Sequence, residues 1–192
     1  MFKIFFYINE LNNIHKENLN QLRNVNIIYR NYRKNDYFKN ALIIANFCKK
    51  KKFKLYVSND IKLARKINSH GLYIPSFNQL TQYKSIFEVI GSAHNEIQVR
   101  NKIQQGCKEI FISPIFNTKS GYNKVGKGLN FYRTHVFKYP KKVKVYALGG
   151  IDHNNFKKII LSGGCGFASI NMIEKEMNSN LISQLNLIAT NS

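Results

Sequence analysis

The sequence predicts a small single-domain (β/α)8 TIM barrel that spans residues 1–192. Short runs of apolar, β-branched or aromatic residues recur eight times, and segments with helical spacing separate most of them. Each run is almost continuously hydrophobic, which is typical of strands in a parallel sheet that helices cover. An open doubly wound sheet is the rival architecture, and the count of eight runs favours the closed barrel.

Strands are predicted at the eight apolar runs, at residues 3–9, 25–32, 53–58, 71–75, 87–92, 109–114, 143–148 and 166–170. The first run lies in the N-terminal sequence MFKIFFYIN, whose apolar stretch is short and has no small-residue cleavage site. It is therefore interpreted as a strand and not as a signal peptide. No run approaches the length that a membrane span requires.

Helices are predicted where apolar residues repeat at spacings of three and four, at residues 42–47, 61–67 and 97–107. The first is expected to begin near Asp36 and to end in the lysine run 49–52, because cations favour the carboxyl end of a helix.

Two further helix starts are marked by single residues. Asn95 is a suitable N-cap for the helix at 97–107, with Glu96 in its first turn. Another helix is expected to start near Met172, directly after the last strand.

The formal net charge is +20, from 30 Lys and Arg against 10 Asp and Glu. The basic residues are spread along the chain, and the only dense run is 49–52. The chain is rich in Asn, Ile, Lys, Phe and Tyr, a composition that AT-rich coding produces without selection for a partner. A field that attracts small phosphorylated substrates is the alternative, and no nucleic-acid-binding signature is present.

The three cysteines, Cys48, Cys107 and Cys165, are odd in number and widely spaced. They form no CxxC pair, so the sequence indicates neither a disulfide framework nor a zinc site. A reducing cytoplasm is the expected location.

The ends of the last two predicted strands indicate a phosphate site. Gly149 and Gly150 end the seventh strand, and Ile170 and Asn171 close the eighth. In a barrel, the loops after these two strands commonly bind phosphate at the carboxyl ends of the strands, where backbone amides converge on the anion. The alternative interpretation is that the two glycines serve only to turn the chain.

A loop rich in Thr, Lys, Ser and Gly, residues 117–128, follows the sixth strand. Thr118, Lys119 and Ser120 offer hydroxyl groups and a cation, which bind pyrophosphate oxygens. Lys127, farther along the loop, is interpreted as a solvated surface residue.

Four stretches of the C-terminal half resemble motifs of the thiamine phosphate synthase/TenI family. In chain order they are IGSAHN at 90–95, SPIFNTKS at 113–120, ALGGIDHNN at 147–155 and GFASINMI at 166–173. The N-terminal half is similar to the family in outline. Arg30 matches the arginine of the family's second strand, whereas Ile28 and Tyr32 stand where the family has Gln and Lys.

The resemblance implies an enzyme that joins 4-amino-2-methyl-5-pyrimidinylmethyl diphosphate to thiazole phosphate and releases pyrophosphate, in thiamine biosynthesis. Such a reaction depends on positioning the reactants and neutralising the leaving group. The implied catalytic residues are Lys119, Arg30 and Ser92. The implied substrate-binding residues are Gly149, Gly150, Ile170 and Asn171 for the thiazole phosphate, Thr118 and Ser120 at the reacting groups, and His94 and Asn59 at the pyrimidine diphosphate.

The chain departs from the family where the family binds its metal. Asn59 and Asn78 stand in place of two aspartates, and magnesium is usually held by carboxylates together with substrate phosphates. The resemblance therefore implies Mg2+ bound mainly through the substrate, with Asn59 and Asn78 as weak ligands. Asp60 is adjacent, but the alternation of a strand directs it elsewhere.

Two functional classes stay open from the residues: a working, divergent synthase, and a TenI-like or non-catalytic thiazole-phosphate-binding protein. The tautomerase branch has a His where Pro114 stands, so that activity would depend on His94. A basic barrel acting on nucleic acid is a third reading and would bind with a steep salt dependence. The expected partners are small phosphorylated substrates and neither nucleic acid nor membrane, and the oligomeric state, a homo-oligomer included, is left open.

Overall fold

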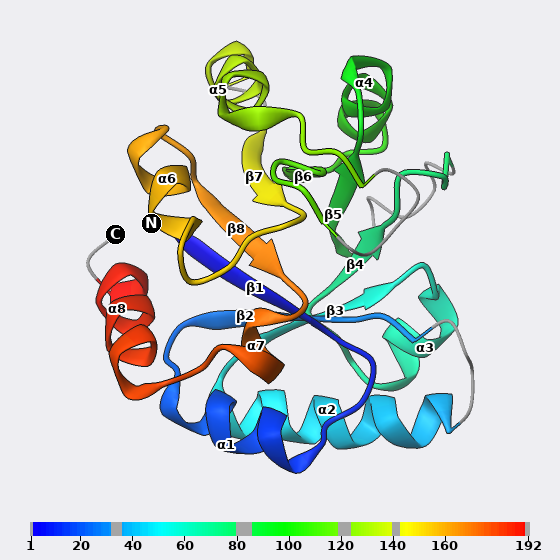
Figure 1. The fold of residues 1–192 in the computed structure, drawn as a ribbon. Coiled ribbons are helices and arrows are strands. Elements are labelled where there is room, and N and C mark those ends of the chain that lie inside the picture. Colours follow the sequence, from blue (N-terminus) through cyan, green and yellow to red (C-terminus); the bar gives the residue numbers. More distant parts are fainter. Residues whose placement is uncertain (1, 32–35, 80–85, 119–123, 140–142, 191–192) are drawn as a thin grey trace.

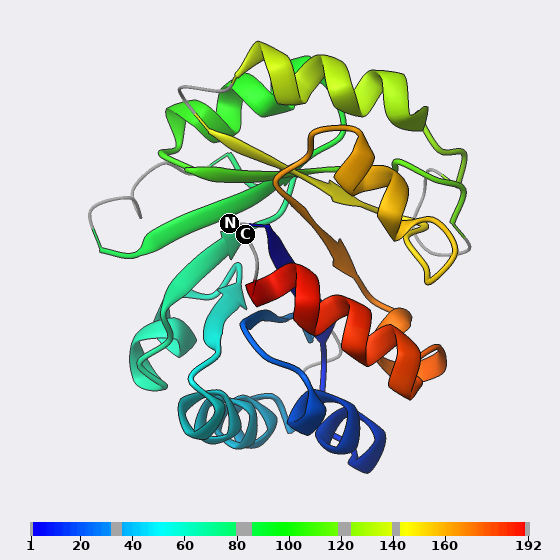
Figure 2. The same cartoon turned by 90° about the vertical axis from the view of Figure 1, so that its left-hand side faces the viewer.

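The computed structural model describes residues 2–31, 36–79, 86–118, 124–139 and 143–190. Across these residues, eight parallel strands form a closed barrel in which each strand pairs with the next along the chain (Figure 1). β8 (Gly166–Ser169) pairs back with β1 (Lys3–Ile8), and this pairing closes the sheet. The turned view shows the helices arranged around the outside of the strands (Figure 2). The predicted barrel is confirmed, and the open sheet is excluded.

The other strands are β2 (Val25–Tyr29), β3 (Lys54–Ser58), β4 (Gly71–Ile74), β5 (Glu88–Ala93), β6 (Glu109–Ile112) and β7 (Lys144–Leu148). The helices are α1 (Asn13–Gln21), α2 (Tyr37–Lys51), α3 (Ile61–Lys66), α4 (Glu96–Gln104), α5 (Gly128–Lys138), α6 (Phe156–Leu161), α7 (Met172–Lys175) and α8 (Ser179–Thr190). All eight predicted strands are present, with ends that differ from the prediction by up to three residues. No helix in the described part of the chain is long and apolar enough to cross a bilayer.

Two strands are clearly shorter than predicted. β6 ends at Ile112 and not at residue 114, because Pro114 has no N–H group to donate to a neighbouring strand. β2 ends at Tyr29, and the N–H of Arg30 still donates to a carbonyl oxygen of β1 at 3.0 Å. β1 therefore holds the backbone of Arg30, and residue 32 lies outside the described residues.

The helix starts agree with the sequence, and one helix end does not. The side chain of Asn95 accepts the N–H of Gln98 at 2.9 Å, as expected of the N-cap of α4. The helix predicted over 97–107 ends at Gln104, because Gly106 has a φ of 85° and this left-handed conformation terminates helices. The starts of α2 and α7 lie where the sequence placed them.

Side chains from all eight strands fill the interior of the barrel, and six of them are aromatic. The buried members of this inner cluster are Phe5, Tyr7, Ile28, Tyr56, Tyr73, Ile90, Phe111, Tyr146, Leu148 and Ala168. Phe5 and Phe111 meet edge to face, with ring centroids 4.9 Å apart, a favoured aromatic geometry. A second cluster occupies the space between strands and helices. Because the interior is packed, substrates must bind above this layer, at the carboxyl ends of the strands.

The inner cluster yields a stability prediction. Phe111→Ala should lower the free energy of unfolding by about 3–5 kcal/mol, because the lost ring leaves a cavity between four aromatic neighbours. Phe137→Ala is the matched control: its ring is 63% exposed on α5, and its loss should change stability by less than about 0.5 kcal/mol. Urea denaturation measures both values. Equal effects of the two substitutions would contradict the packed interior.

Candidate active site

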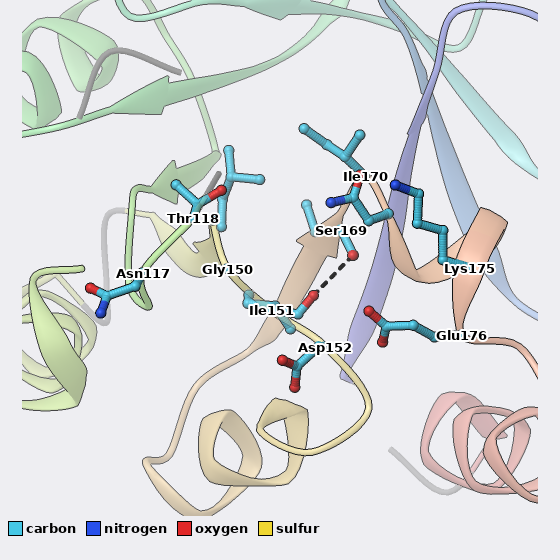
Figure 3. Close-up of a pocket in the computed structure, with 13 residues that line it drawn as sticks. Asn117, Thr118, Gly150, Ile151, Asp152, Ser169, Ile170, Lys175 and Glu176 are labelled. Carbon is cyan, nitrogen blue, oxygen red and sulfur yellow. Dashed lines mark hydrogen bonds between the residues drawn. The ribbon is translucent and has the colours of Figure 1, made fainter. Parts of the chain in front are cut away.

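A cavity of about 380 Å3 opens at the carboxyl ends of β7 and β8 (Figure 3). The loops after β6, β7 and β8 and the helix α7 supply its walls. Its lining residues are Asn117, Thr118, Leu148, Gly149, Gly150, Ile151, Asp152, Ala168, Ser169, Ile170, Asn171, Lys175 and Glu176. The structure thus brings together five residues that the sequence assigned to substrate binding: Thr118, Gly149, Gly150, Ile170 and Asn171.

Gly149 and Gly150 form the wall where the β7 loop crosses the β6 loop. Their φ angles are +90° and +68°, which L side chains rarely adopt. A Cβ on Gly150 would lie 2.3 Å from the carbonyl oxygen of Asn117, and one on Gly149 would lie 2.8 Å from Cα of Pro114. Turning and close packing therefore require both glycines without any ligand, so their presence alone is not a sign of bound phosphate.

Hydrogen bonds fix the two walls of the cavity. The side-chain amide of Asn155 donates to the carbonyl oxygen of Gly150 at 2.8 Å. The hydroxyl of Ser169, at the end of β8, donates to the carbonyl oxygen of Ile151 at 3.1 Å (Figure 3). The β7 and β8 loops are thereby joined directly, and their spacing is set before any ligand arrives.

Three charged residues at the cavity were not predicted from the sequence as site residues. Asp152 is occupied, because its Oδ1 accepts two backbone N–H groups of the following turn. Glu176 is occupied by the backbone N–H and ring Nδ1 of His153, at 2.8 and 3.1 Å. The backbone N–H of Lys175 donates to the carbonyl oxygen of Asn171 at 3.0 Å, but its ammonium makes no hydrogen bond or ion pair with the described residues. It follows Asn171 by four positions, so one helical turn returns its side chain to the face of the cavity, as Figure 3 shows.

The opposite half of the barrel mouth is polar. Because side chains alternate along a strand, the residues two positions beyond Tyr56, Ile90 and Phe111 also point inward. These residues are Ser58, Ser92 and Ser113, all buried. Of the three, only Ser92 was predicted from the sequence as a site residue. The alternation of side chains along β3 and β6 was the signal that could have indicated the other two.

Arg30 and His94 stand at this polar half. The guanidinium carbon of Arg30 lies 4.8 Å from the ring centre of Tyr7, a cation–π geometry that holds the charge above the aromatic layer. Nδ1 of His94 lies 2.9 Å from the carbonyl oxygen of Ser113. A carbonyl only accepts, so Nδ1 carries the proton.

The loop after β6 contributes contacts that the sequence did not indicate. Lys127 is exposed, as predicted, yet its ammonium donates to the carbonyl oxygen of His94 and lies 4.8 Å from the ring centre of Phe131. It therefore ties this loop to the end of β5. The backbone N–H of Thr118 donates to the backbone carbonyl oxygen of Lys124 at 2.9 Å. Lys119 and Ser120 lie outside the described residues.

Asn59 and Asn78, the two candidate metal ligands, are bonded to each other. The side-chain amide of Asn78 donates to Oδ1 of Asn59, and the N–H of Asn59 donates to the carbonyl oxygen of Tyr73 at 2.9 Å. The neighbouring Asp60 caps α3 by accepting the N–H of Leu63 at 2.9 Å. Among the described residues, no group of three or more His, Cys, Asp or Glu could hold a metal ion. These residues therefore do not fit a protein-bound magnesium ion.

Comparisons with known proteins agree with this geometry. A family model described as Thiamine monophosphate synthase matches residues 13–173. A thiamine-phosphate synthase of Prochlorococcus marinus (strain AS9601) is 28% identical over 149 residues, which cover 75% of this chain and 41% of that protein. One of Flavobacterium psychrophilum is 24% identical over 188 residues, which cover 92% of this chain and 91% of that protein. The chain thus spans well under half of the first relative and nearly all of the second.

A solved structure shares the fold. The thiamine phosphate pyrophosphorylase from Pyrococcus furiosus is similar with a TM-score of 0.79, and the match covers 97% of this chain and 95% of that chain. The sequence identity is 14%, so this likeness speaks for the barrel and not for the chemistry.

The packing of the β6 and β7 loops is testable with two glycines. Gly150→Ala should lower the free energy of unfolding by about 1–3 kcal/mol for the φ of +68° alone, and by more because of the 2.3 Å contact. Gly128→Ala is the matched control, because its φ is +82° but nothing lies within 4 Å of the added Cβ. Thermal and urea unfolding of both variants would separate strain from collision. A Gly150 variant no less stable than the Gly128 variant would contradict this packing.

Proposed function

The chain belongs to the thiamine monophosphate synthase family, and from this premise we propose that it joins the aminopyrimidine diphosphate to thiazole phosphate and releases pyrophosphate. One observation carries the proposal: a cavity with phosphate-binding groups and a polar half-site lie at the same end of one barrel. Residues 1–192 are taken to act as a single domain. The three free cysteines support the cytoplasmic location that the sequence predicts.

The cavity at β7 and β8 is assigned to thiazole phosphate. Its phosphate would meet the backbone of the β7 and β8 loops, where Gly150 and Asn171 lie. Lys175 adds a cation that the described residues leave uncommitted. Leu148 and Ile170 offer apolar surface beside these polar groups, which suits the uncharged face of a heterocyclic ring.

The polar half is assigned to the pyrimidine diphosphate. Ser92 and His94 stand at the end of β5, and Arg30 holds its charge at the end of β2. In the proposed reaction the bond between the pyrimidine methylene carbon and the diphosphate oxygen breaks, and its electron pair leaves with pyrophosphate. The thiazole nitrogen then donates its lone pair to the methylene carbon. Arg30, and Lys119 by resemblance, would stabilise the charge that develops on the leaving group.

The magnesium that the resemblance implies would reach the site with the diphosphate, because Asn59 and Asn78 supply no carboxylate. When bound, such an ion neutralises diphosphate charge. The chain itself contributes Arg30 and the inward hydroxyl groups, and its rigid loops hold the two reactants in contact.

A thiazole-phosphate-binding protein without synthase activity is the second candidate. The observation in its favour is the amide pair of Asn59 and Asn78 where the family has metal-binding carboxylates. The cavity would serve this function equally well, because it lies at β7 and β8 and not at β3 and β4.

A single-turnover assay with both substrates distinguishes the two candidates. The proposed synthase should form thiamine phosphate and pyrophosphate, in equal amounts, within one turnover. The measurement is chromatographic quantification of both products, with and without added magnesium. If thiazole phosphate binds but no product forms in either condition, the binding protein is the correct reading.

The phosphate assignment is tested by an isosteric change of charge. Asn171→Asp should weaken binding of thiazole phosphate about tenfold or more, because it places a carboxylate beside the phosphate, and a desolvated like charge costs at least about 1.4 kcal/mol. Asn130→Asp adds the same charge on α5, away from the cavity, and should leave the affinity within about twofold. Titration calorimetry measures both constants. Unchanged affinity in the Asn171 variant would place the phosphate elsewhere.

A further inference from the structure

A buried cation lies behind the Asn59–Asn78 pair, and the proposed function leaves it unused. Lys102, on α4, is 1% exposed. Its Nζ lies 2.7 Å from the backbone carbonyl oxygen of Asn78 and 2.8 Å from Oε1 of Gln105. The side-chain amide of Gln105 donates to the same Asn78 carbonyl at 3.0 Å. The backbone carbonyl oxygen of Asn78, in the loop after β4, thus receives two donors, one from α4 and one from its C-cap residue.

The lysine reaches this position because Gly91 has no side chain. A Cβ on Gly91 would lie 2.8 Å from Cδ of Lys102 and 3.0 Å from Sγ of Cys107. The aliphatic stem therefore occupies the space that a larger residue of β5 would fill. Burial lowers the pKa of Lys102 to about 8, so the charged form is held there at a cost in stability.

No carboxylate compensates this charge among the described residues, because Lys102 forms none of their ion pairs. Its polar contacts are a carbonyl and an amide oxygen, both neutral. The ends of β3 and β4 therefore carry an unneutralised positive charge behind two neutral amides. A positive charge at these two strand ends repels a divalent cation and attracts an anion.

A short series of hydrogen bonds runs from this cation to the mouth of the barrel. The ammonium of Lys102 donates to the backbone carbonyl oxygen of Asn78, and the side-chain amide of Asn78 donates to Oδ1 of Asn59. The N–H of Asn59 in turn donates to the carbonyl oxygen of Tyr73, in β4. By the resemblance, the family's two metal-binding aspartates would stand at the same two strand ends. Here a hydrogen bond between the two amides joins these ends.

We propose that Lys102 is a positioning residue that fixes the ends of β3 and β4 in place of a protein-bound divalent ion. The site at these two strand ends then accepts a diphosphate without a protein-bound divalent ion. The proposal rests on the proposed function for the identity of the diphosphate. It assigns to Lys102 no contact with the substrate: the residue acts through Asn78 and through its field.

Pyrophosphate is the probe, and titration calorimetry in EDTA and in magnesium is the measurement. The unaltered protein should bind pyrophosphate with affinities that differ by less than about threefold between the two conditions. Lys102→Met should weaken that binding in EDTA at least fivefold while the melting temperature stays the same or rises, because an apolar residue replaces a buried charge. A merely structural lysine would lower the melting temperature instead.

Two variants serve as controls. Lys108→Met removes an equal charge from an exposed position at the start of β6, at the other end of the barrel, and should bind pyrophosphate as the unaltered protein does. Asn78→Ala keeps Lys102 and removes the contact with Asn59. It should weaken pyrophosphate binding, though less than Lys102→Met does because the field of Lys102 remains, and it covers the case in which the buried substitution does not fold.

Asn59→Asp combined with Asn78→Asp restores the two carboxylates. This variant should bind pyrophosphate poorly in EDTA and at least tenfold more tightly with magnesium. A magnesium requirement of that size in the unaltered protein would overturn the proposal, and so would the absence of pyrophosphate binding. Full affinity in both Lys102→Met and Asn78→Ala would overturn it as well.

The outcomes separate this proposal from the proposed function. If substrate coupling proceeds at the unaltered rate in Lys102→Met, the positioning role fails and the synthase reading stands. If no coupling occurs in any variant but pyrophosphate binding depends on Lys102 and not on magnesium, the synthase reading fails and the positioning role stands.

Discussion

The packing of large side chains inside the barrel determines where this protein can do chemistry. Phe5, Tyr56, Phe111 and Tyr146 fill the lower interior, and every one of them is fully buried. Water and ligands are therefore excluded from the layer of rings. Polar inward side chains lie at both ends of this layer, with the three serines toward the mouth and Glu109 at the other end, where it pairs with Lys3. The division of the mouth follows from this layer, with hydroxyl groups on one side and the β7–β8 cavity on the other.

The two proposed phosphate sites at the mouth are built by different means. At β7 and β8 the loops are held by their own hydrogen bonds, and Lys175, the cation that the described part of the chain places there, is exposed. At β3 and β4 the strand ends are held through Asn78 by a cation that solvent does not reach. Exposed charges are screened by salt and buried charges much less so. The two half-sites should thus differ in their response to ionic strength.

The sequence predicted the architecture well, because its signals are local and repeated. Continuous apolar runs marked the strands, and Asn95 marked a helix start by a cap that the structure contains. The sequence pointed to Gly149 and Gly150 but left open whether a bound phosphate or the turn of the chain requires them. The close approach of Asn117 to Gly150 could not be predicted, because it joins segments that are 33 positions apart. The burial of Lys102 could not be predicted either, because nothing near it in the sequence distinguishes it from the other Lys and Arg among the 30 of the chain. The roles assigned to all the site residues remain predictions, and Lys119 and Ser120 also lie outside the described residues.

The space at Gly91 links two positions that a designer would otherwise treat as independent. A lysine at position 102 fits only while position 91 lacks a Cβ, and Gln105 must be present to receive one of its protons. Gly91, Lys102 and Gln105 must therefore be transferred together if this arrangement is built into another protein. Moving the lysine alone into a related barrel would produce a collision or an unsatisfied charge. Moving all three together with the two asparagines would transfer the whole set of hydrogen bonds that joins the ends of β3 and β4.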